Sequence, residues 1–246
     1  MKTFIPDAEF IALNGGPVSV ADMTPQQRES YDALMRERGM AFQKVGACRV
    51  IGSMLDDVEN RVKSLAGHWA AETADRLILE TLTIGNMSAD YIGWLQNPEV
   101  SRYLETRHSA QTREGIAKFV EDMLASDKDL MMGIFLKEKK KHIGNIKLGS
   151  VNWRYGRADI GIIIGDMTCW GKGYGTEAIN CLCRIAFDTI GLRRVEAGAY
   201  AGNKASIKSF LKADFRQEGV QRGRWIVDGK PEDGVLLARL SDREQN

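Results

Sequence analysis

The sequence predicts an α/β fold of the α+β kind, a mixed sheet with helices on its faces. Three observations predict it. Apolar strand-like runs alternate with helix-like runs from residue 76 to residue 246. One of them, ADIGIIIG at residues 158–165, is almost wholly apolar and is expected at the centre of the sheet. A glycine-rich stretch, WGKGYGTEA at residues 170–178, then leads directly into a helix.

Composition limits the classes of protein to consider. The chain has 246 residues, 43% of them hydrophobic, which is enough for one domain with an added segment. Its 34 basic and 33 acidic residues give a net charge of +1, which argues against a dedicated nucleic-acid binder. No apolar run approaches the roughly 18 residues of a membrane span. The N-terminal residues lack the apolar core of a secretion signal. We therefore expect a cytoplasmic protein with no membrane partner.

Residues 1–75 are expected to form a mostly helical N-terminal extension of unknown role. Thr24 can cap a first helix, with Pro25 at its first position. A second helix is expected to open near Ser53, because apolar residues recur there at spacings of three or four. These residues are Leu55, Val58, Val62, Leu65 and Trp69. Such a stripe must pack on the rest of the chain or on a partner, and it is a candidate homodimer contact.

The first half of the domain at residues 76–246 is expected to hold a strand, two helices and a hairpin. The run RLILETLT at residues 76–83 is strand-like. Ser88 can cap a helix that stops before Asn97 and Pro98, and Thr112 can cap another. The apolar face of this second helix would carry Ile116, Phe119, Val120, Met123 and Leu124. Two strands follow, joined by a lysine-rich turn that we interpret as a solvated hairpin tip, at residues 130–136 and 142–149.

The second half continues from the apolar strand and the glycine stretch. After their helix, RRVEAGAY at residues 193–200 is expected to be a strand and NKASIKSFLKA at residues 203–213 a helix. WIVDG and VLLARL, the latter at residues 235–240, are expected to be closing strands. The predicted order is β, α, α, β, β, β, α, β, α, β, β.

The glycine stretch has a chemical interpretation besides a tight turn. A turn from a central strand into a helix leaves the first N–H groups of the helix unpaired, and with the helix dipole they form an anion site. Glycines allow the backbone to approach a pyrophosphate closely, and Lys172 could add a positive charge. The pattern lacks the GK(S/T) ending of a Walker loop and the spacing of a dinucleotide-binding fingerprint.

The succession of ADIGIIIG, the glycine stretch, RRVEAGAY, Asn203-x-x-Ser206 and KADF resembles the GCN5-related N-acetyltransferase (GNAT) superfamily. It is most similar to the Rim-type branch, which acetylates ribosomal-protein N-termini, and to its small-molecule relatives. Gly173 and Gly175 match the two glycine places of the family pattern, whereas Trp170 replaces its Gln or Arg. The resemblance covers residues 76–240. It implies a sheet that splays between two parallel strands.

The resemblance implies acetyl-CoA as the co-substrate and assigns its contacts. Pyrophosphate would lie on the residues of the loop, which are Trp170, Gly171, Lys172, Gly173, Tyr174, Gly175 and Thr176. Pantetheine would pair with the strand backbone at Ile162, Ile163 and Ile164. Asn203 and Ser206 would face the same cofactor, although Asn203 could also be a plain helix cap. No metal is expected, because the four cysteines and three histidines form no ligand motif.

Direct attack of an amine on the thioester needs a base, an oxyanion donor and a proton for the thiolate. The resemblance implies an oxyanion amide near Ile163 or Ile164. Many relatives carry a proton-donating tyrosine five residues before the phenylalanine that aligns with Phe215, but Phe210 stands there. Ser206 matches the serine proposed in the Rim-type branch. Asp214 replaces the usual glycine of the KxGF turn and is expected to keep its left-handed conformation.

Three residues are candidates for the general base: Glu105, His108 and Asp159. Glu105 is preferred, because YLETRH follows the first helix, where substrate enters in this family. Each of the three could instead be an ordinary surface residue, and a chain of water molecules could do the same work.

The acceptor has two interpretations, a small-molecule amine or a peptide N-terminus. We favour an amino sugar, including a nucleotide-linked one, over a protein α-amine. The residues expected near the mouth are Arg102, Tyr103, Arg107, His108, Trp153 and Arg154. A third interpretation, a non-catalytic CoA-binding module, is supported by the missing tyrosine and opposed by the intact glycine loop.

Overall fold

The computed structural model describes residues 41–45, 48–52 and 71–242. Its main sheet has eight strands in the order β3-β4-β5-β6-β7-β8-β10-β9. These strands are β3 (Ala71–Thr73), β4 (Leu77–Thr81), β5 (Leu130–Leu136), β6 (His142–Asn152), β7 (Arg157–Ile164), β8 (Arg194–Tyr200), β9 (Arg216–Val227) and β10 (Lys230–Leu240). The helices are α4 (Asp90–Gln96), α5 (Pro98–Ser101), α6 (Arg113–Ala125), α7 (Tyr174–Arg184) and α8 (Lys204–Lys212). Short turns of helix are η1 (Glu105–His108), η2 (Met167–Cys169) and η3 (Ile185–Thr189).

The α/β architecture predicted for residues 76–246 is confirmed, and several local signals work as expected, although Phe119 of the predicted apolar face is 40% exposed. The Thr112 side chain accepts from the Gly115 N–H and caps α6, and the Asn203 side chain accepts from the Ser206 N–H and caps α8. Asp214 has φ of 63°, the left-handed conformation expected of it. One short helix, α5, was not expected. Asn97 ends α4 and its side chain accepts from the Glu99 N–H, so the same residue caps α5.

The N-terminal extension differs from the expectation where it is described. Residues 41–45 and 48–52 form an antiparallel pair, β1 (Ala41–Val45) and β2 (Cys48–Gly52), and not helix. The short segments AFQKV and CRVIG carry β-branched and aromatic residues, a signal that the neighbouring helical patterns obscured. β3 belongs to the main sheet, although it precedes residue 76. The helices expected around Thr24 and from Ser53 lie outside the described residues.

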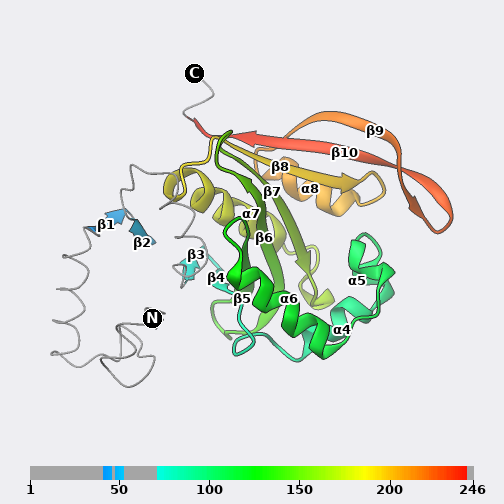
Figure 1. The fold of residues 1–246 in the computed structure, drawn as a ribbon, viewed down its shortest axis with the longest axis horizontal. Coiled ribbons are helices and arrows are strands. Elements are labelled where there is room, and N and C mark those ends of the chain that lie inside the picture. The colour runs from blue at the N-terminus through cyan, green and yellow to red at the C-terminus, as the bar shows by residue number, and fades with distance from the viewer. Residues whose placement is uncertain (1–40, 46–47, 53–70, 243–246) are drawn as a thin grey trace.

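Helices α4 and α6 lie on one face of the sheet and α7 and α8 on the other (Figure 1), and a hydrophobic cluster fills each side. Met132 joins the cluster with α7 and α8, whereas its neighbour Met131 joins the cluster with α4 and α6. Adjacent strand residues point to opposite faces, so this alternation separates the two layers. α7 lies close to the centre of the larger cluster, with Ile179 and Leu182 fully buried.

β7 and β8 are the parallel pair among the described strands. Their pairing runs from Arg157 opposite Arg194 only as far as Asp159 opposite Glu196. β7 then continues to Ile164 and β8 to Tyr200 with no further pairs, so the two strands diverge. β10 runs beside the whole of β8 on its other edge. The splayed pair expected from the family resemblance is therefore present.

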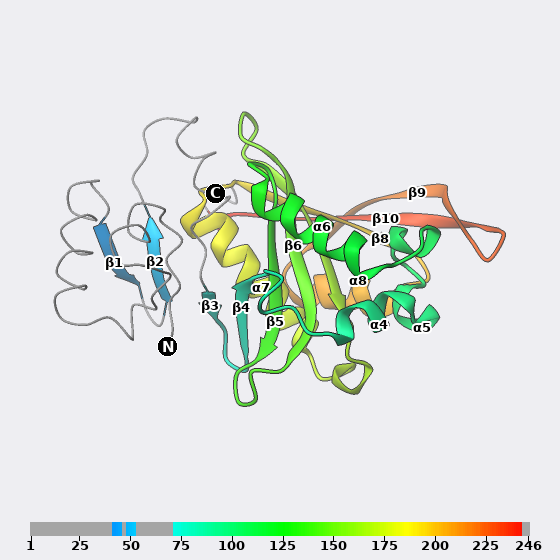
Figure 2. The same ribbon diagram turned by 60° about the horizontal axis from the view of Figure 1, so that its bottom comes forward.

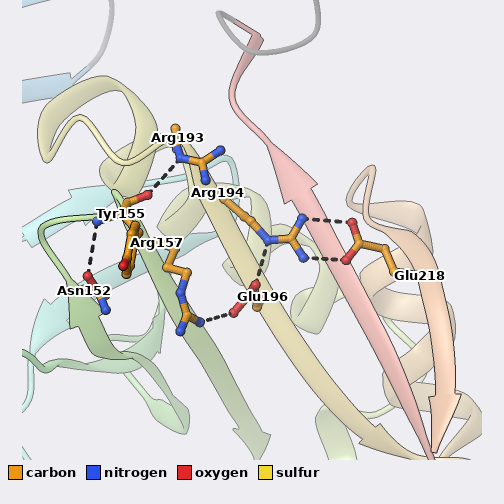
Figure 3. Close-up of polar contacts among 7 residues, drawn as sticks. All are labelled: Asn152, Tyr155, Arg157, Arg193, Arg194, Glu196 and Glu218. Carbon is orange, nitrogen blue, oxygen red and sulfur yellow. Dashed lines mark hydrogen bonds and ion pairs between the residues drawn. The ribbon is translucent and has the colours of Figure 1, made fainter.

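Ion pairs hold the closed end of the splay (Figure 3). The Arg157 guanidinium on β7 donates to Glu196 on β8 at 2.6 Å, and Arg194 donates to the other oxygen of Glu196 at 2.6 Å. Arg194 also forms a two-pronged ion pair with Glu218, reaching across β10 to β9. Together these ion pairs link β7, β8 and β9 near the point where β7 and β8 part.

The opposite end of β9 and β10 forms a long hairpin, which extends past the sheet on the side of α4 and α5 (Figure 2). Its tip contacts the C-cap residue of α5 and the η1 turn. Arg102 binds Asp228 at 3.0 Å, and Arg107 donates to the Ile226 carbonyl at 3.5 Å. The hairpin and η1 therefore face each other at the open end of the splay.

A buried histidine is expected to make stability depend on pH. His142 lies among aromatic rings of α4 and β5; its Nδ1 accepts from the Ser88 N–H and its Nε2 faces the Asn145 amide oxygen. Burial lowers the pKa of His142 below 6.5, against the opposing hydrogen bond to Asn145 and the charge of Asp90. The unfolded chain therefore binds this proton more readily than the folded chain. The free energy of unfolding should fall as pH drops below 6.5.

Urea unfolding of wild type and His142→Gln at about pH 7.5 and 5.5 would measure this effect. The wild type should lose more stability between the two pH values than the variant. Equal losses in both proteins would show that His142 contributes nothing to the pH dependence.

Candidate functional site

The connection from β7 into the glycine turn is fixed by Asp166. Its carboxylate accepts from the Thr168 N–H at 2.9 Å and from the Lys141 ammonium at 2.6 Å. Burial raises the pKa of Asp166, but these hydrogen bonds outweigh burial and lower it to about 2. The charged carboxylate thus caps the η2 turn and sets where the glycine stretch begins.

The glycine turn has the conformation that an anion site requires. Gly171 and Gly173 have φ of 73° and 83°, which side-chain-bearing residues adopt at a cost. Gly173 is the N-cap residue of α7, which starts at Tyr174. The N–H groups of the first turn, from Tyr174 to Thr176, have no partners within the helix and point out of its end. Gly175 lies in that turn, and an added Cβ there would approach the Ser209 hydroxyl to 3.5 Å.

One edge of β7 faces the space opened by the splay. The Gly165 N–H donates to Ile143 on β6, so the backbone of the preceding residue, Ile164, points the other way. The Trp170 indole N–H donates to the Ile164 carbonyl at 2.7 Å, which agrees with this direction. By alternation Ile162 also faces the gap, whereas Ile163 faces β6. Of the two oxyanion candidates, the geometry therefore favours the Ile164 amide over that of Ile163.

Helix α8 follows the far strand of the splay and carries two of the expected contacts. Asn203 caps the helix, and the Ser206 side chain is half-buried in its first turn. Phe210, which stands in place of the tyrosine of many relatives, is buried against Phe215 with ring centroids 5.0 Å apart. It fills the core and offers no proton.

Glu105 lies in a polar cluster that the sequence did not reveal. The Tyr200 hydroxyl at the end of β8 donates to the Glu105 carboxylate, and Arg107 donates to the same hydroxyl at 3.0 Å. Burial and then the Glu105 carboxylate raise the pKa of Tyr200. The Tyr200 ring stacks on Trp225 of the hairpin and lies beside Tyr103, with centroids 4.1 Å and 5.4 Å away.

This cluster lies level with the middle of the splayed edge of β7. Six positions beyond the paired Arg157 and Arg194 stand Ile163 and Tyr200. Residues directly opposite on parallel strands point to the same face, so both side chains lie on the face of α4. Tyr200 at the end of β8 thus holds Glu105 at the open end of the splay.

Asp159 and His108 lie less favourably. Asp159 is at the closed end, about 13 Å along the strand from Ile163 at roughly 3.3 Å per residue. Burial and the nearby charge of Glu196 raise its pKa. His108 is exposed at the end of η1, as Glu105 is at its start, but the hydrogen bond from Tyr200 goes to Glu105.

Two of the residues expected at the mouth lie elsewhere, which corrects the expectation. Trp153 and Arg154 precede β7, at the closed end of the splay, because the β6–β7 turn lies opposite the glycine turn along the strand. Arg102, Tyr103 and Arg107 do gather near the open end. Tyr200 and Trp225 were missed, since an aromatic residue in a strand normally signals core packing.

Two general features of the described ranges bear on partners. No helix there is long and apolar enough to cross a membrane. Within the same ranges, no three His, Cys, Asp or Glu side chains converge as a metal site would require.

Comparison with known proteins gives consistent matches. A model of the acetyltransferase (GNAT) domain matches residues 76–216. The uncharacterized N-acetyltransferase YoaA of Bacillus subtilis is 30% identical over 173 residues, which cover 69% of this chain and 96% of that protein.

Two solved structures resemble the fold. The ribosomal-protein-S5-alanine acetyltransferase of Vibrio fischeri superposes with a TM-score of 0.63 at 18% identity, over 70% of this chain and 97% of that one. The spermidine N-acetyltransferase of Vibrio cholerae, in complex with CoA and spermine, has a TM-score of 0.61 at 17% identity, over 70% and 99%.

Proposed function

Because the chain belongs to the GNAT acetyltransferase family, we propose that residues 76–246 transfer an acetyl group from acetyl-CoA to a primary amine by direct attack. The observation that carries the proposal is the combination of a splayed parallel pair with a helix N-terminus behind two left-handed glycines. The first feature opens a slot beside a strand edge, and the second provides an anion site at its end.

Coenzyme A would bind with its pyrophosphate at the glycine turn and its pantetheine arm along β7. Its pyrophosphate would accept hydrogen bonds from the backbone N–H groups of the turn between Gly171 and Thr176, near Lys172. Pantetheine would run along the free edge of β7 and pair with the backbone of Ile162 and with the carbonyl of Ile164, which leaves the Ile164 N–H for the thioester oxygen. Trp170, Tyr174 and Gly175 would flank the phosphates, and Asn203 would face the pantetheine arm. A similar fold binds CoA in the spermidine N-acetyltransferase.

The chemical step needs one proton moved from nitrogen to sulfur. The amine nitrogen attacks the thioester carbonyl carbon, and the Ile164 N–H stabilises the resulting oxyanion. Glu105 takes the amine proton, held in place by its hydrogen bond from Tyr200. The C–S bond then breaks, and the thiolate receives a proton through Ser206. His108 and Asp159 take no part in this scheme.

For the acceptor we propose an amino sugar, including a nucleotide-linked one. Tyr103 and Trp225 flank Tyr200, so three aromatic rings gather beside Glu105, and aromatic rings of this kind commonly contact sugar rings. Arg102 and Arg224 lie against Tyr103 and Trp225, and their guanidinium groups suit phosphate. A peptide N-terminus would use the same opening and is the second candidate. An acetyltransferase of ribosomal protein S5 shares the fold.

The test is release of CoA thiol by the full chain with acetyl-CoA and three acceptor sets. These are UDP-linked amino sugars with a free amine, the same sugars already N-acetylated, and peptides with free N-termini. Thiol release is expected with the free amino sugars and not with their acetylated forms. Turnover of the peptides alone would overturn the acceptor. CoA binding with no turnover on a broad amine panel would indicate a binding module, and absence of CoA binding would overturn the whole proposal.

A further inference from the structure

Arg76 lies between β3 and β4, about 100 residues before the glycine turn in sequence, yet its side chain contacts that turn directly. Its Nη1 donates to the Lys172 carbonyl at 2.9 Å. Its guanidinium carbon lies 4.5 Å from the centre of the Tyr174 ring. A Cβ added at Gly173 would come within 3.5 Å of Arg76 Nη2. The half-exposed guanidinium therefore packs against the turn.

A carboxylate of α7 fixes Arg76 in this position. Glu177 accepts from the Arg76 backbone N–H at 2.6 Å and from its Nε at 2.7 Å. The Glu177 side chain is only 13% exposed, and its own N–H closes the first turn of α7 on the Gly173 carbonyl at 3.1 Å. The Arg76 carbonyl accepts from the Lys137 N–H at 2.8 Å, so the residue is also tied to the end of β5.

The contact with Lys172 determines which way one peptide group points. In a trans peptide the carbonyl of Lys172 and the N–H of Gly173 point in opposite directions. Since the carbonyl is held toward Arg76, the Gly173 N–H is directed away from it, outward from the turn. Gly171 and Gly173 both have positive φ, and glycine's freedom would otherwise let this peptide rotate. Arg76 supplies the bond that selects one orientation.

We propose that Arg76 is a positioning residue for coenzyme A: by holding the Lys172 carbonyl, it keeps the Gly173 N–H directed at the cofactor phosphates. The inference rests on the proposed function and extends it to a residue outside the glycine motif. Glu177 acts with it as the anchor that holds the guanidinium in place. In the alternative arrangement, Arg76 would itself bind a phosphate, and Glu177 would then compete with the ligand for it.

Calorimetric titration of the full chain with CoA separates the two arrangements. Arg76→Gln should weaken binding on the order of tenfold, the loss typical of one hydrogen bond that involves a charged group. Glu177→Gln should weaken it similarly, because the guanidinium loses its anchor. The double variant should bind no more weakly than the weaker single variant, since both act through one contact. Arg76→Lys should restore only part of the affinity, because an ammonium lacks the guanidinium fork.

A matched control lies at the other end of α7, where Arg184 pairs with Glu72 of β3 at 3.8 Å. Arg184→Gln removes an ion pair between α7 and β3, next to the segment that carries Arg76, without changing a contact of the turn. Its melting temperature should fall while its affinity for CoA stays within about twofold of wild type, which separates positioning from general destabilisation.

Three results would overturn the inference. Unchanged affinity in Arg76→Gln would show that the turn holds its conformation alone. Tighter binding in Glu177→Gln, together with weaker binding in Arg76→Gln, would assign Arg76 a direct phosphate contact. An equal loss of CoA affinity in Arg184→Gln would show that the effect of Arg76→Gln comes from reduced stability of the fold. In all three cases the wild-type protein still binds CoA, so the proposed function stands. A wild-type protein that fails to bind CoA would overturn the proposed function itself.

Discussion

Gly173→Val is expected to weaken coenzyme A binding on the order of 100-fold or more. Gly173 has φ of 83° at the N-cap of α7, a conformation that a β-branched residue essentially does not adopt. The turn must move, and the Gly173, Tyr174 and Gly175 N–H groups move with it. Loss of two hydrogen bonds to a charged phosphate costs about 3 kcal/mol or more, which is on the order of 100-fold in affinity.

Calorimetry with CoA measures this directly, and Gly93→Val is the matched control. Gly93 is exposed in α4, and an added Cβ there meets nothing within 4 Å. The control should bind CoA as wild type does and should lose no stability through helix propensity, because valine ranks above glycine inside a helix. If Gly173→Val bound CoA normally, the phosphates would have to lie elsewhere.

Glu105→Gln is expected to lower kcat by about 100-fold or more while leaving CoA affinity unchanged, because a positioned general base contributes 10²–10⁴-fold. The amide keeps the size of the side chain and can still accept from Tyr200, but it cannot take up the amine proton. Steady-state kinetics at saturating acetyl-CoA, with the acceptor identified by thiol release, would give the number.

Asp159→Asn makes the same chemical change at the closed end of the splay and should reduce kcat by less than about tenfold. Tyr200→Phe removes the hydrogen bond to Glu105 and should give an intermediate loss, because the carboxylate remains but is no longer held. The assignment of the base would be reversed by a large loss in Asp159→Asn beside a near-normal Glu105→Gln.

Local signals carried much of the fold. Thr112 and Asn203 predict the starts of their helices, because a capping hydrogen bond joins residues that are three apart in the chain. The apolar run of β7 indicates a strand in the interior of the sheet, and the glycines at 171 and 173 mark left-handed positions. The short strands β1 and β2 were not predicted, because the segments on either side of them have a helical periodicity.

The sequence by itself determined the glycine turn, the helix behind it and the pair of strands around it, since each depends on residues close together in the chain. Tertiary structure alone decided that Tyr200 meets Glu105 across 95 positions and that Arg76 meets Glu177 across 101. It also decided that Ile164, and not Ile163, turns its backbone to the gap. These contacts depend on strand order and register, which place distant side chains together, and no local pattern of residue types encodes that placement.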